Sequence, residues 1–243
     1  MVCERLGAKS VEKILLTAAV LTVFTGYASA FAGGSGTQAD PYEIANCVQL
    51  QEIQNGTTGS LSDHYKLVSD IDCSATENWN NGNGFKPIGT DSTPFTGSVD
   101  GKGNRIQNFY INRQNLDYVG LFGFLDSATG LKNFTVLKSD VTGNRVAGGV
   151  IGYKSSGKAS NLIFKGNVTG SNQVGGVVGS NFGGNITDSK ASVNVSGDSF
   201  VGGLVGRNIA NIISSKATGS INGVDDKVGG LTGYSLGEIR NST

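Results

Sequence analysis

The chain has 243 residues, of which 38 are glycine and only 3 are proline, and its 19 basic and 19 acidic residues cancel. Glycine at about twice its average share, with so little proline, excludes collagen, which needs abundant proline and glycine at every third place. Hydrophobic residues make up 37% of the chain, so sustained disorder is excluded as well. The balanced charge provides no basic field for nucleic acid or acidic membranes. We therefore expect an all-β protein with many turns.

Residues 1–30 have the features of a secretory signal peptide. A basic start that ends at Lys13 precedes the apolar run Ile14–Tyr27, and Ala28-Ser29-Ala30 is a small-residue cleavage site. The apolar run is too short for a membrane anchor, which needs about 20 apolar residues. We expect cleavage after Ala30, a secreted or cell-surface location, and no membrane insertion of the mature chain.

Residues 31–116 are expected to form an N-terminal cap and the first irregular coils of the fold. Tyr42–Ile44, Tyr65–Val68 and Ile106–Ile111 read as strands, and Val48–Ile53 reads as a short helix. An Asn- and Gly-rich loop surrounds Trp79, the one tryptophan of the chain. The uneven spacing of these segments is what separates them from the rest of the chain.

Two cysteines, Cys47 and Cys73, remain after the loss of Cys3 with the signal peptide. In an exported chain a disulfide between them is the simplest expectation, and it would pin the cap. Two free buried thiols are the alternative. A metal site is unfavoured because His64 is the only histidine, and the sequence indicates no cofactor.

A short phrase recurs from residue 117 onward. It reads DYVGLFG from Asp117, VAGGVIG from Val146, QVGGVVG from Gln173, FVGGLVG from Phe200 and KVGGLTG from Lys227, so the last four starts are evenly spaced and the first interval is slightly longer. Between phrases lies a segment in which apolar and polar residues alternate, which is typical of a strand with one buried face. A unit of about 27 residues with short strands and glycine turns has the size of one coil of a β-solenoid. We expect residues 117–243 to be stacked coils.

The glycines of the phrase are interpreted as structural, because they permit a bend and a close approach where a Cβ atom would clash. A phosphate-binding role is unfavoured, since no G-x-x-x-x-G-K-[ST] motif occurs. These glycines are Gly120, Gly123, Gly148, Gly149, Gly152, Gly175, Gly176, Gly179, Gly202, Gly203, Gly206, Gly229, Gly230 and Gly233.

The segments GLFG, GGVVG and GGLVG resemble the GLUG motif, a short repeat of large exported bacterial and archaeal surface proteins. Such proteins include adhesin-like chains and the non-catalytic parts of IgA-specific metallopeptidases. FTGSVDGKGNRIQNFYI, residues 95–111, resembles the segment before the first repeat, and GTQADPYEIANCVQLQEI from Gly36 resembles the opening of β-helical secreted proteins. The resemblance implies a right-handed parallel β-helix and an outer-surface role. It implies no activity, and H-E-x-x-H is absent.

Two acidic pairs are the weak candidates for catalysis. Asp70 and Asp72 would lie on one side of a strand, and Asp225 and Asp226 are adjacent. Polysaccharide lyases and hydrolases with β-helical folds place acidic groups on one outer face. Acidic residues at turns and strand ends are more often hydrogen-bonding residues, and His64 belongs to no recognisable triad.

The sequence favours an exported, non-enzymatic β-solenoid that acts as an adhesion or spacer module. Its partners would be glycans, host proteins or neighbouring surface proteins, met by many weak contacts along a repetitive polar face. The alternative is a polysaccharide-active β-helix enzyme, which would need a cleft of convergent carboxylates. Ice binding is a weaker alternative, because the outward columns mix Lys, Ser, Asn and Thr. The repeats read as truncated, so we expect further repeats or another chain at the C-terminal end.

Overall fold

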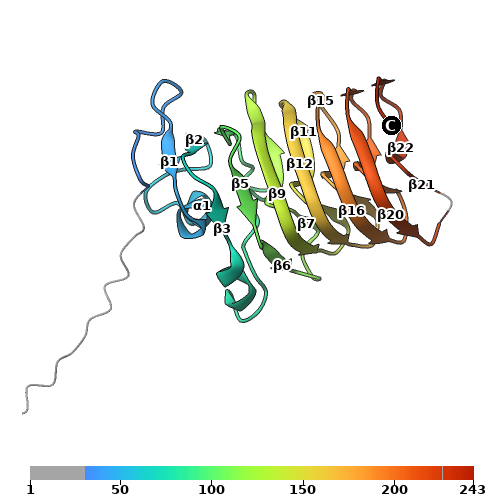
Figure 1. Cartoon of the computed structure of the whole chain (residues 1–243), viewed down its shortest axis with the longest axis horizontal. Coiled ribbons are helices and arrows are strands. Elements are labelled where there is room, and N and C mark those ends of the chain that lie inside the picture. The colour runs from blue at the N-terminus through green and yellow to red at the C-terminus, as the bar shows by residue number, and fades with distance from the viewer. Residues whose placement is uncertain (1–30, 226) are drawn as a thin grey trace, which may run out of the picture.

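The computed structural model describes residues 31–225 and 227–243. The expected signal peptide, with Cys3, and Asp226 lie outside the described residues. Strands from successive parts of the chain lie side by side along one axis, as Figure 1 shows. They pair in parallel and form a β-solenoid of about 7 turns, about 27 residues apart. This confirms the predicted all-β fold of stacked parallel coils.

The largest sheet, here called sheet A, contains 13 strands of the described residues. They are β1 (Tyr42–Ile44), β2 (His64–Leu67), β3 (Ile71–Asp72), β4 (Ser98–Asp100), β5 (Arg105–Gln107), β6 (Tyr110–Asn112), β9 (Gly130–Thr142), β12 (Ala159–Thr169), β15 (Ile186–Thr187), β16 (Lys190–Gly197), β19 (Ile212–Ile213), β20 (Lys216–Gly223) and β23 (Ile239–Arg240).

Two smaller sheets of five strands each complete the coils. Sheet B holds β8 (Phe122–Asp126), β11 (Ile151–Ser156), β14 (Val178–Asn181), β18 (Val205–Asn208) and β22 (Thr232–Ser235). Sheet C holds β7 (Tyr118–Val119), β10 (Val146–Gly148), β13 (Gln173–Gly175), β17 (Val201–Gly202) and β21 (Val228–Gly229).

The recurring phrase builds the corner where the chain passes from sheet C to sheet B. A Cβ atom on the first glycine of the GG pair, as at Gly175, would lie 2.1 Å from the carbonyl oxygen three residues ahead, that of Val178. A Cβ atom on the second, as at Gly176, would lie 2.2 Å from the oxygen of Gly203 in the next coil. Such contacts are too short for any other residue, so close approach within and between coils requires glycine here.

The other glycines of the phrase lie in equivalent places, with one exception. Cβ atoms on the closing glycines would lie between 2.4 and 2.7 Å from backbone atoms of a neighbouring coil, at Gly123, Gly152, Gly179, Gly206 and Gly233. A Cβ atom on Gly120 would lie 2.7 Å from the oxygen of Gly148. The first-position glycines Gly148, Gly202 and Gly229 repeat the 2.1 Å contact of Gly175, and Gly149 and Gly203 repeat the contact of Gly176. Gly230 is the exception, since a Cβ atom there would meet nothing within 4 Å.

The segment between phrases is a strand with one buried face. Ala191, Val193 and Val195 of β16 are each at most 4% exposed, while the residues between them are exposed. Each of these residues pairs with the residue one repeat earlier in β12, such as Val195 with Val168. The predicted alternation is confirmed, and stacking places the same face of β12 and β16 in the core.

The short helix expected in residues 31–116 is α1 (Cys47–Asn55). The side chain of Asn46 accepts a hydrogen bond from the backbone N–H of Gln49 at its start, and Gly56 ends it with a left-handed φ of 69°. The 3₁₀ helix η1 (Ser74–Asn78) follows β3. Within the described residues, no helix combines the length and apolar character needed to cross a membrane.

The prediction of a single strand at Ile106–Ile111 is wrong, because two strands occupy this segment. Asn108 has a φ of 58°, which breaks the segment into β5 and β6 and turns the chain so that Phe109 points into the core with 1% exposure. Asparagine tolerates the left-handed conformation because its short polar side chain bonds locally. The alternation pattern alone does not reveal this corner.

The expected disulfide is present and joins Cys47 at the start of α1 to Cys73 after β3. The Cα atoms are 5.2 Å apart, and the two side chains are 5% and 0% exposed. The bond therefore fastens the helix to sheet A from inside the core.

Candidate ligand-binding groove

An outward row of charged residues crosses the N-terminal strands of sheet A. Parallel register places Glu43, Lys66, Asp100, Lys132 and Ser160 next to one another on successive coils. Their chain neighbours, such as Tyr65, Val99 and Leu131, are at most 2% exposed, so the alternation of the strands turns the charged row to solvent. The row alternates in charge along its first four members.

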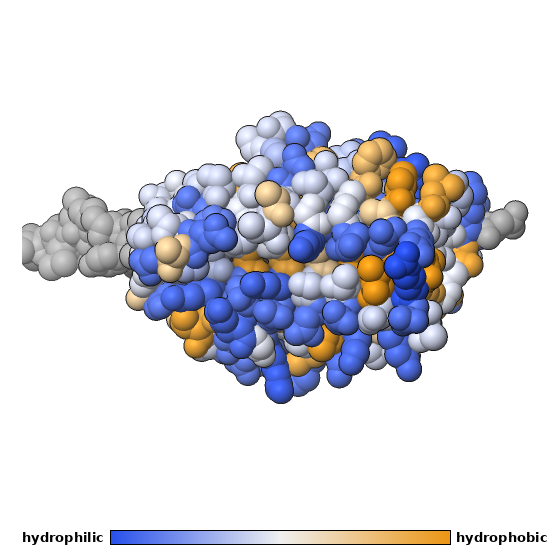
Figure 2. Space-filling model, turned by 90° about the horizontal axis from the view of Figure 1, so that it is seen from above, coloured by the Kyte–Doolittle hydropathy of each residue, from blue (hydrophilic) through white to orange (hydrophobic). Residues whose placement is uncertain are grey.

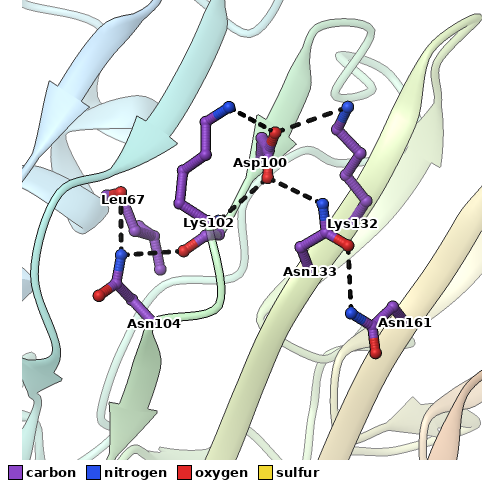
Figure 3. Close-up of polar contacts among 8 residues, drawn as sticks. Leu67, Asp100, Lys102, Asn104, Lys132, Asn133 and Asn161 are labelled. Atoms are coloured by element: carbon purple, nitrogen blue, oxygen red, sulfur yellow. Dashed lines mark hydrogen bonds and ion pairs between the residues drawn. The ribbon is translucent and has the colours of Figure 1, made fainter.

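Asp100 is the centre of the polar contacts drawn in Figure 3. Its carboxylate lies 3.0 Å from the ammonium of Lys102 and 3.5 Å from that of Lys132, and it accepts a hydrogen bond of 3.1 Å from the side chain of Asn133. Burial by itself raises the pKa of Asp100, but the hydrogen bonds of Lys102 and Asn133 and the charge of Lys132 outweigh it, so that the pKa is lowered. Asp100 is therefore ionised at neutral pH.

A hollow of about 780 Å³ lies over this row. The loop that contains Gln38 and Pro41 forms part of its wall, and its polar lining includes His64, Lys66, Ser98, Lys102, Lys132 and Lys158. Nδ1 of His64 lies 2.7 Å from Oγ of Ser98. Lys66 pairs with Glu43 at 3.1 Å, whereas Lys158 has no side-chain partner among the described residues. With Glu43 included, four lysines face two carboxylates, so the hollow carries a positive charge.

The acidic candidates Asp70 and Asp72 do not line this hollow, and each serves the next coil. Asp70 accepts a 2.8 Å hydrogen bond from the backbone N–H of Arg105, and Asp72 accepts one of 2.9 Å from the side chain of Asn108. The bonds from Asn108 and Ser74 lower the pKa of Asp72. Both carboxylates thus hold turns together, as acidic residues at strand ends commonly do.

Asp225, the described member of the second acidic pair, lies between β20 and β21, remote in sequence from the hollow. Asp225 is exposed, and its backbone N–H donates to the oxygen of Asp198 at 2.8 Å. Asp226 lies outside the described residues. Within residues 31–225 and 227–243, no three His, Cys, Asp or Glu side chains gather closely enough to hold a metal ion.

A polar row runs inside the solenoid and was missed by sequence reasoning. Register aligns Leu125, Lys154, Asn181, Asn208 and Ser235 on successive coils of sheet B. The amide of Asn181 donates to the amide oxygen of Asn208 at 2.7 Å, and that of Asn208 donates to Ser235 at 2.9 Å. Each residue stands two places after the closing glycine of its phrase, so the spacing of the asparagines was the available signal.

Lys154 is the first polar member of this inner row and is 0% exposed. Its Nζ donates to the side-chain oxygen of Asn181 at 3.1 Å, to the oxygen of Gly184 at 2.9 Å and to the oxygen of Gly183. Burial lowers the pKa of Lys154 to about 7. The three oxygens match the three donors of an ammonium group and oppose that shift.

Aromatic side chains form a stack along sheet B. The rings of Phe124 and Tyr153 are stacked with centroids 4.7 Å apart, and Phe182 stacks on Tyr153 at 6.3 Å. Contacts between the rings of successive coils stabilise the coil-to-coil register, while Phe182 remains 51% exposed.

Comparisons with known proteins place these features in context. Residues 170–196 and 199–222 match the GLUG motif. The chain is 45% identical to halomucin of Haloquadratum walsbyi over 134 residues, or 53% of this chain, and 36% identical to a protein named as a Gly-rich membrane protein of Evansella cellulosilytica over 114 residues, or 47% of this chain. The matches cover 1% and 13% of those proteins, so the chain spans a small part of their length.

The fold also resembles that of a solved structure. The crystal structure of a protein described as an immunoglobulin A1 protease from Bacteroides ovatus matches with a TM-score of 0.63. The match covers 88% of this chain and 77% of that chain at 21% identity. At this identity the likeness supports the shared β-helical architecture and no further property.

Proposed function

We propose that this chain is a stretch of stacked coils in an exported surface protein, where it acts as a non-enzymatic adhesion or spacer module, because it carries GLUG repeats folded as a β-solenoid. The observation that carries the proposal is the regular outward display of polar side chains. In β12 and β16, for example, Asn194 lies beside Asn167, and its amide donates to that residue at 2.9 Å. Stacked coils hold such rows at about 4.8 Å per coil, which suits many weak contacts.

The names of the relatives support a surface location. Halomucin and the Gly-rich membrane protein carry names of surface or membrane proteins, and both are far longer than this chain. A rigid stack of coils would extend such a protein away from the cell at a fixed spacing. Export through the expected signal peptide, residues 1–30, is part of the proposal.

The surface of the described residues also favours presentation over catalysis. Hydrophilic residues cover most of the face drawn in Figure 2, while hydrophobic residues gather toward the C-terminal end. The hollow over sheet A is lined by lysines and by Asp100 as its single carboxylate, and Asp100 is held in ion pairs. A polysaccharide-degrading β-helix needs convergent carboxylates, and Asp70 and Asp72 are engaged in turns instead.

Glycan-array binding combined with a turnover assay tests this function. The purified chain is applied to a broad array, and every hit is assayed for released reducing or unsaturated sugars. Binding without turnover is expected for an adhesion module, and silence in both assays is expected for a spacer. Turnover that disappears in Asp70→Asn or Asp225→Asn would overturn the proposal in favour of an enzyme.

A further inference from the structure

We propose that the lysine-lined hollow over sheet A binds an anionic polysaccharide, that is, a glycan chain bearing carboxylate or sulfate groups. The inference rests on the proposed adhesion function and names the ligand class for it. The hollow of about 780 Å³ holds Lys66, Lys102, Lys132 and Lys158 in its lining. This volume lies within the range typical of ligand sites, about 300–1,000 Å³.

The exposure of the charged side chains determines whether a ligand first meets positive or negative charge. The side chain of Asp100 is 18% exposed, whereas those of Lys102 and Lys132 are 57% and 54% exposed. Figure 3 shows the two lysines reaching Asp100 from opposite sides. An approaching molecule therefore meets ammonium groups above a carboxylate that they partly cover, and a negative group can bind without displacing the ion pairs.

The charge balance of the hollow leaves capacity for an anion. Asp100 and Glu43 together offset two of the four lysines, and Lys158 has no side-chain partner among the described residues. The pKa of Asp100 is lowered, and Glu43 forms an ion pair with Lys66. Even with both acids charged, the hollow carries an excess of positive charge, which attracts anions over about 8 Å at physiological ionic strength.

The register of sheet A arranges the lysines of the hollow along the solenoid axis. Lys66 and Lys132 lie two strands apart, with Asp100 between them, which separates their backbones by about 9.5 Å along the solenoid axis. Lys158 lies in the next coil, directly before β12. A linear polymer with repeated negative groups can therefore run across the coils and meet a lysine more than once.

A polysaccharide fits this surface better than a nucleic acid does. Single-stranded nucleic acids stack their bases on exposed aromatic rings, and the one Phe, Tyr or Trp ring of the lining, that of Tyr65, is 1% exposed. Duplex binding depends on an extended basic surface, while the chain as a whole has a formal net charge of zero. Sugar hydroxyl groups can instead bond to the polar wall, which includes His64, Ser98 and Ser160.

Affinity titration of the purified chain tests the inference. Polygalacturonate supplies carboxylates, dextran sulfate supplies sulfates, and unmodified dextran is the neutral control. We expect binding to at least one of the two anionic polymers, none to dextran, and a loss of affinity between 50 and 300 mM salt of about tenfold or more. The polymer that binds more tightly identifies the anionic group.

Matched variants locate the site. Lys132→Gln with Lys158→Gln is expected to weaken binding about tenfold, whereas Lys165→Gln with Lys190→Gln, exposed lysines of sheet A outside the hollow, is expected to change it less than twofold. Equal losses in both variants would overturn the proposal, because they would show attraction to scattered surface charge. Absence of binding to both anionic polymers, or tighter binding to single-stranded or duplex DNA at equal charge concentration, would overturn it too.

The same titration separates this inference from the proposed function. Samples from each mixture are assayed for released sugars. Loss of binding in the hollow variant without any turnover supports both proposals. Turnover overturns the non-enzymatic function, while binding to neutral or host glycans on the array with no preference for anionic polymers overturns only the choice of ligand.

Discussion

Residues 31–116 and residues 117–243 solve the same stacking problem with different degrees of regularity. Along sheet A the register partners Tyr42, Tyr65, Val99 and Leu131 are separated by chain segments of clearly different lengths. In the later coils the partners Leu131, Ala159, Ile186, Ile212 and Ile239 follow one another at nearly constant intervals. Uneven coils therefore still stack in parallel register, although helix α1 and the 3₁₀ helix η1 interrupt the chain between paired strands.

The two regions also differ in what they place on their surfaces. The hollow and its charged row lie where the two regions meet, since residues 31–116 supply Lys66, Asp100 and Lys102 and residues 117–243 supply Lys132 and Lys158. The outward row continues through Thr187 and Ile213 without further charge until Arg240. Regular coils are held by shared corners and an inner polar row. Regularity therefore serves stacking, while the junction of irregular and regular coils provides room for a specific site.

Loss of the disulfide should weaken the irregular region most. Cys47→Ser with Cys73→Ser removes a cross-link that joins positions with a sequence separation of 26, and the chain-entropy relation predicts a loss of about 3.5 kcal/mol in the free energy of unfolding. Denaturant unfolding of variant and wild type measures it. Reduction of the wild type should cause the same loss and leave the variant unchanged. An unaltered unfolding midpoint would show that helix α1 is held by packing alone.

The regular region should be most sensitive at its corners. Gly176→Ala places a Cβ atom 2.2 Å from the oxygen of Gly203, so the backbone must shift and unfolding should become easier by about 3 kcal/mol. Gly230→Ala is the matched control, because it changes the same place in the phrase where a Cβ atom meets nothing within 4 Å. We expect its stability to be unchanged or raised by up to about 1 kcal/mol. Equal effects in thermal unfolding would refute the close-approach explanation.

The inner polar row should make the regular region sensitive to pH. Burial lowers the pKa of Lys154 to about 7, below its value of 10.5 in the unfolded chain, so between these values the unfolded state binds more protons. Stability should then rise with pH through this window, by up to about 1.4 kcal/mol per pH unit, and be flat below it. Lys154→Met removes the titrating group, and its difference from the wild type, measured by denaturant unfolding at pH 7, 8 and 9, isolates the effect. Equal slopes would show that the surrounding oxygens keep the proton on Lys154.

The parts of the fold that recur were open to prediction from sequence. We could predict the corner from the phrase that recurs at Gln173 and Phe200, and the strand with one buried face from the alternation around Ala191 and Val193. The disulfide could be predicted because only one pair of cysteines remains after residue 30. The corner at Asn108 could not be predicted, because an asparagine in an apolar segment is compatible with both an extended and a left-handed backbone.

The hollow over sheet A also could not be predicted from the sequence, and the reason is different. Lys66, Asp100 and Lys132 come together only through pairing of strands that are unevenly spaced along the chain. No sequence repeat in this part of the chain indicates which residues pair. Lys154 was equally hidden, since a lysine in the sequence indicates an exposed side chain unless its position in the coil is known. Sequence periodicity thus reveals what every coil shares and conceals what a single coil adds.

The constant register of the later coils has a consequence for how such a chain can change its length. Each regular coil contacts only its neighbours, so a deletion from Gly175 to Val201 would join Val174 directly to Gly202 and leave the pairing of the remaining strands in phase. A gene encoding these coils can therefore gain or lose whole units by unequal recombination without creating a new corner. A corresponding deletion from Lys66 to Val99 would place Asp100 beside Glu43, and the two carboxylates would repel each other. The number of regular coils can therefore change more easily than the coils that form the hollow.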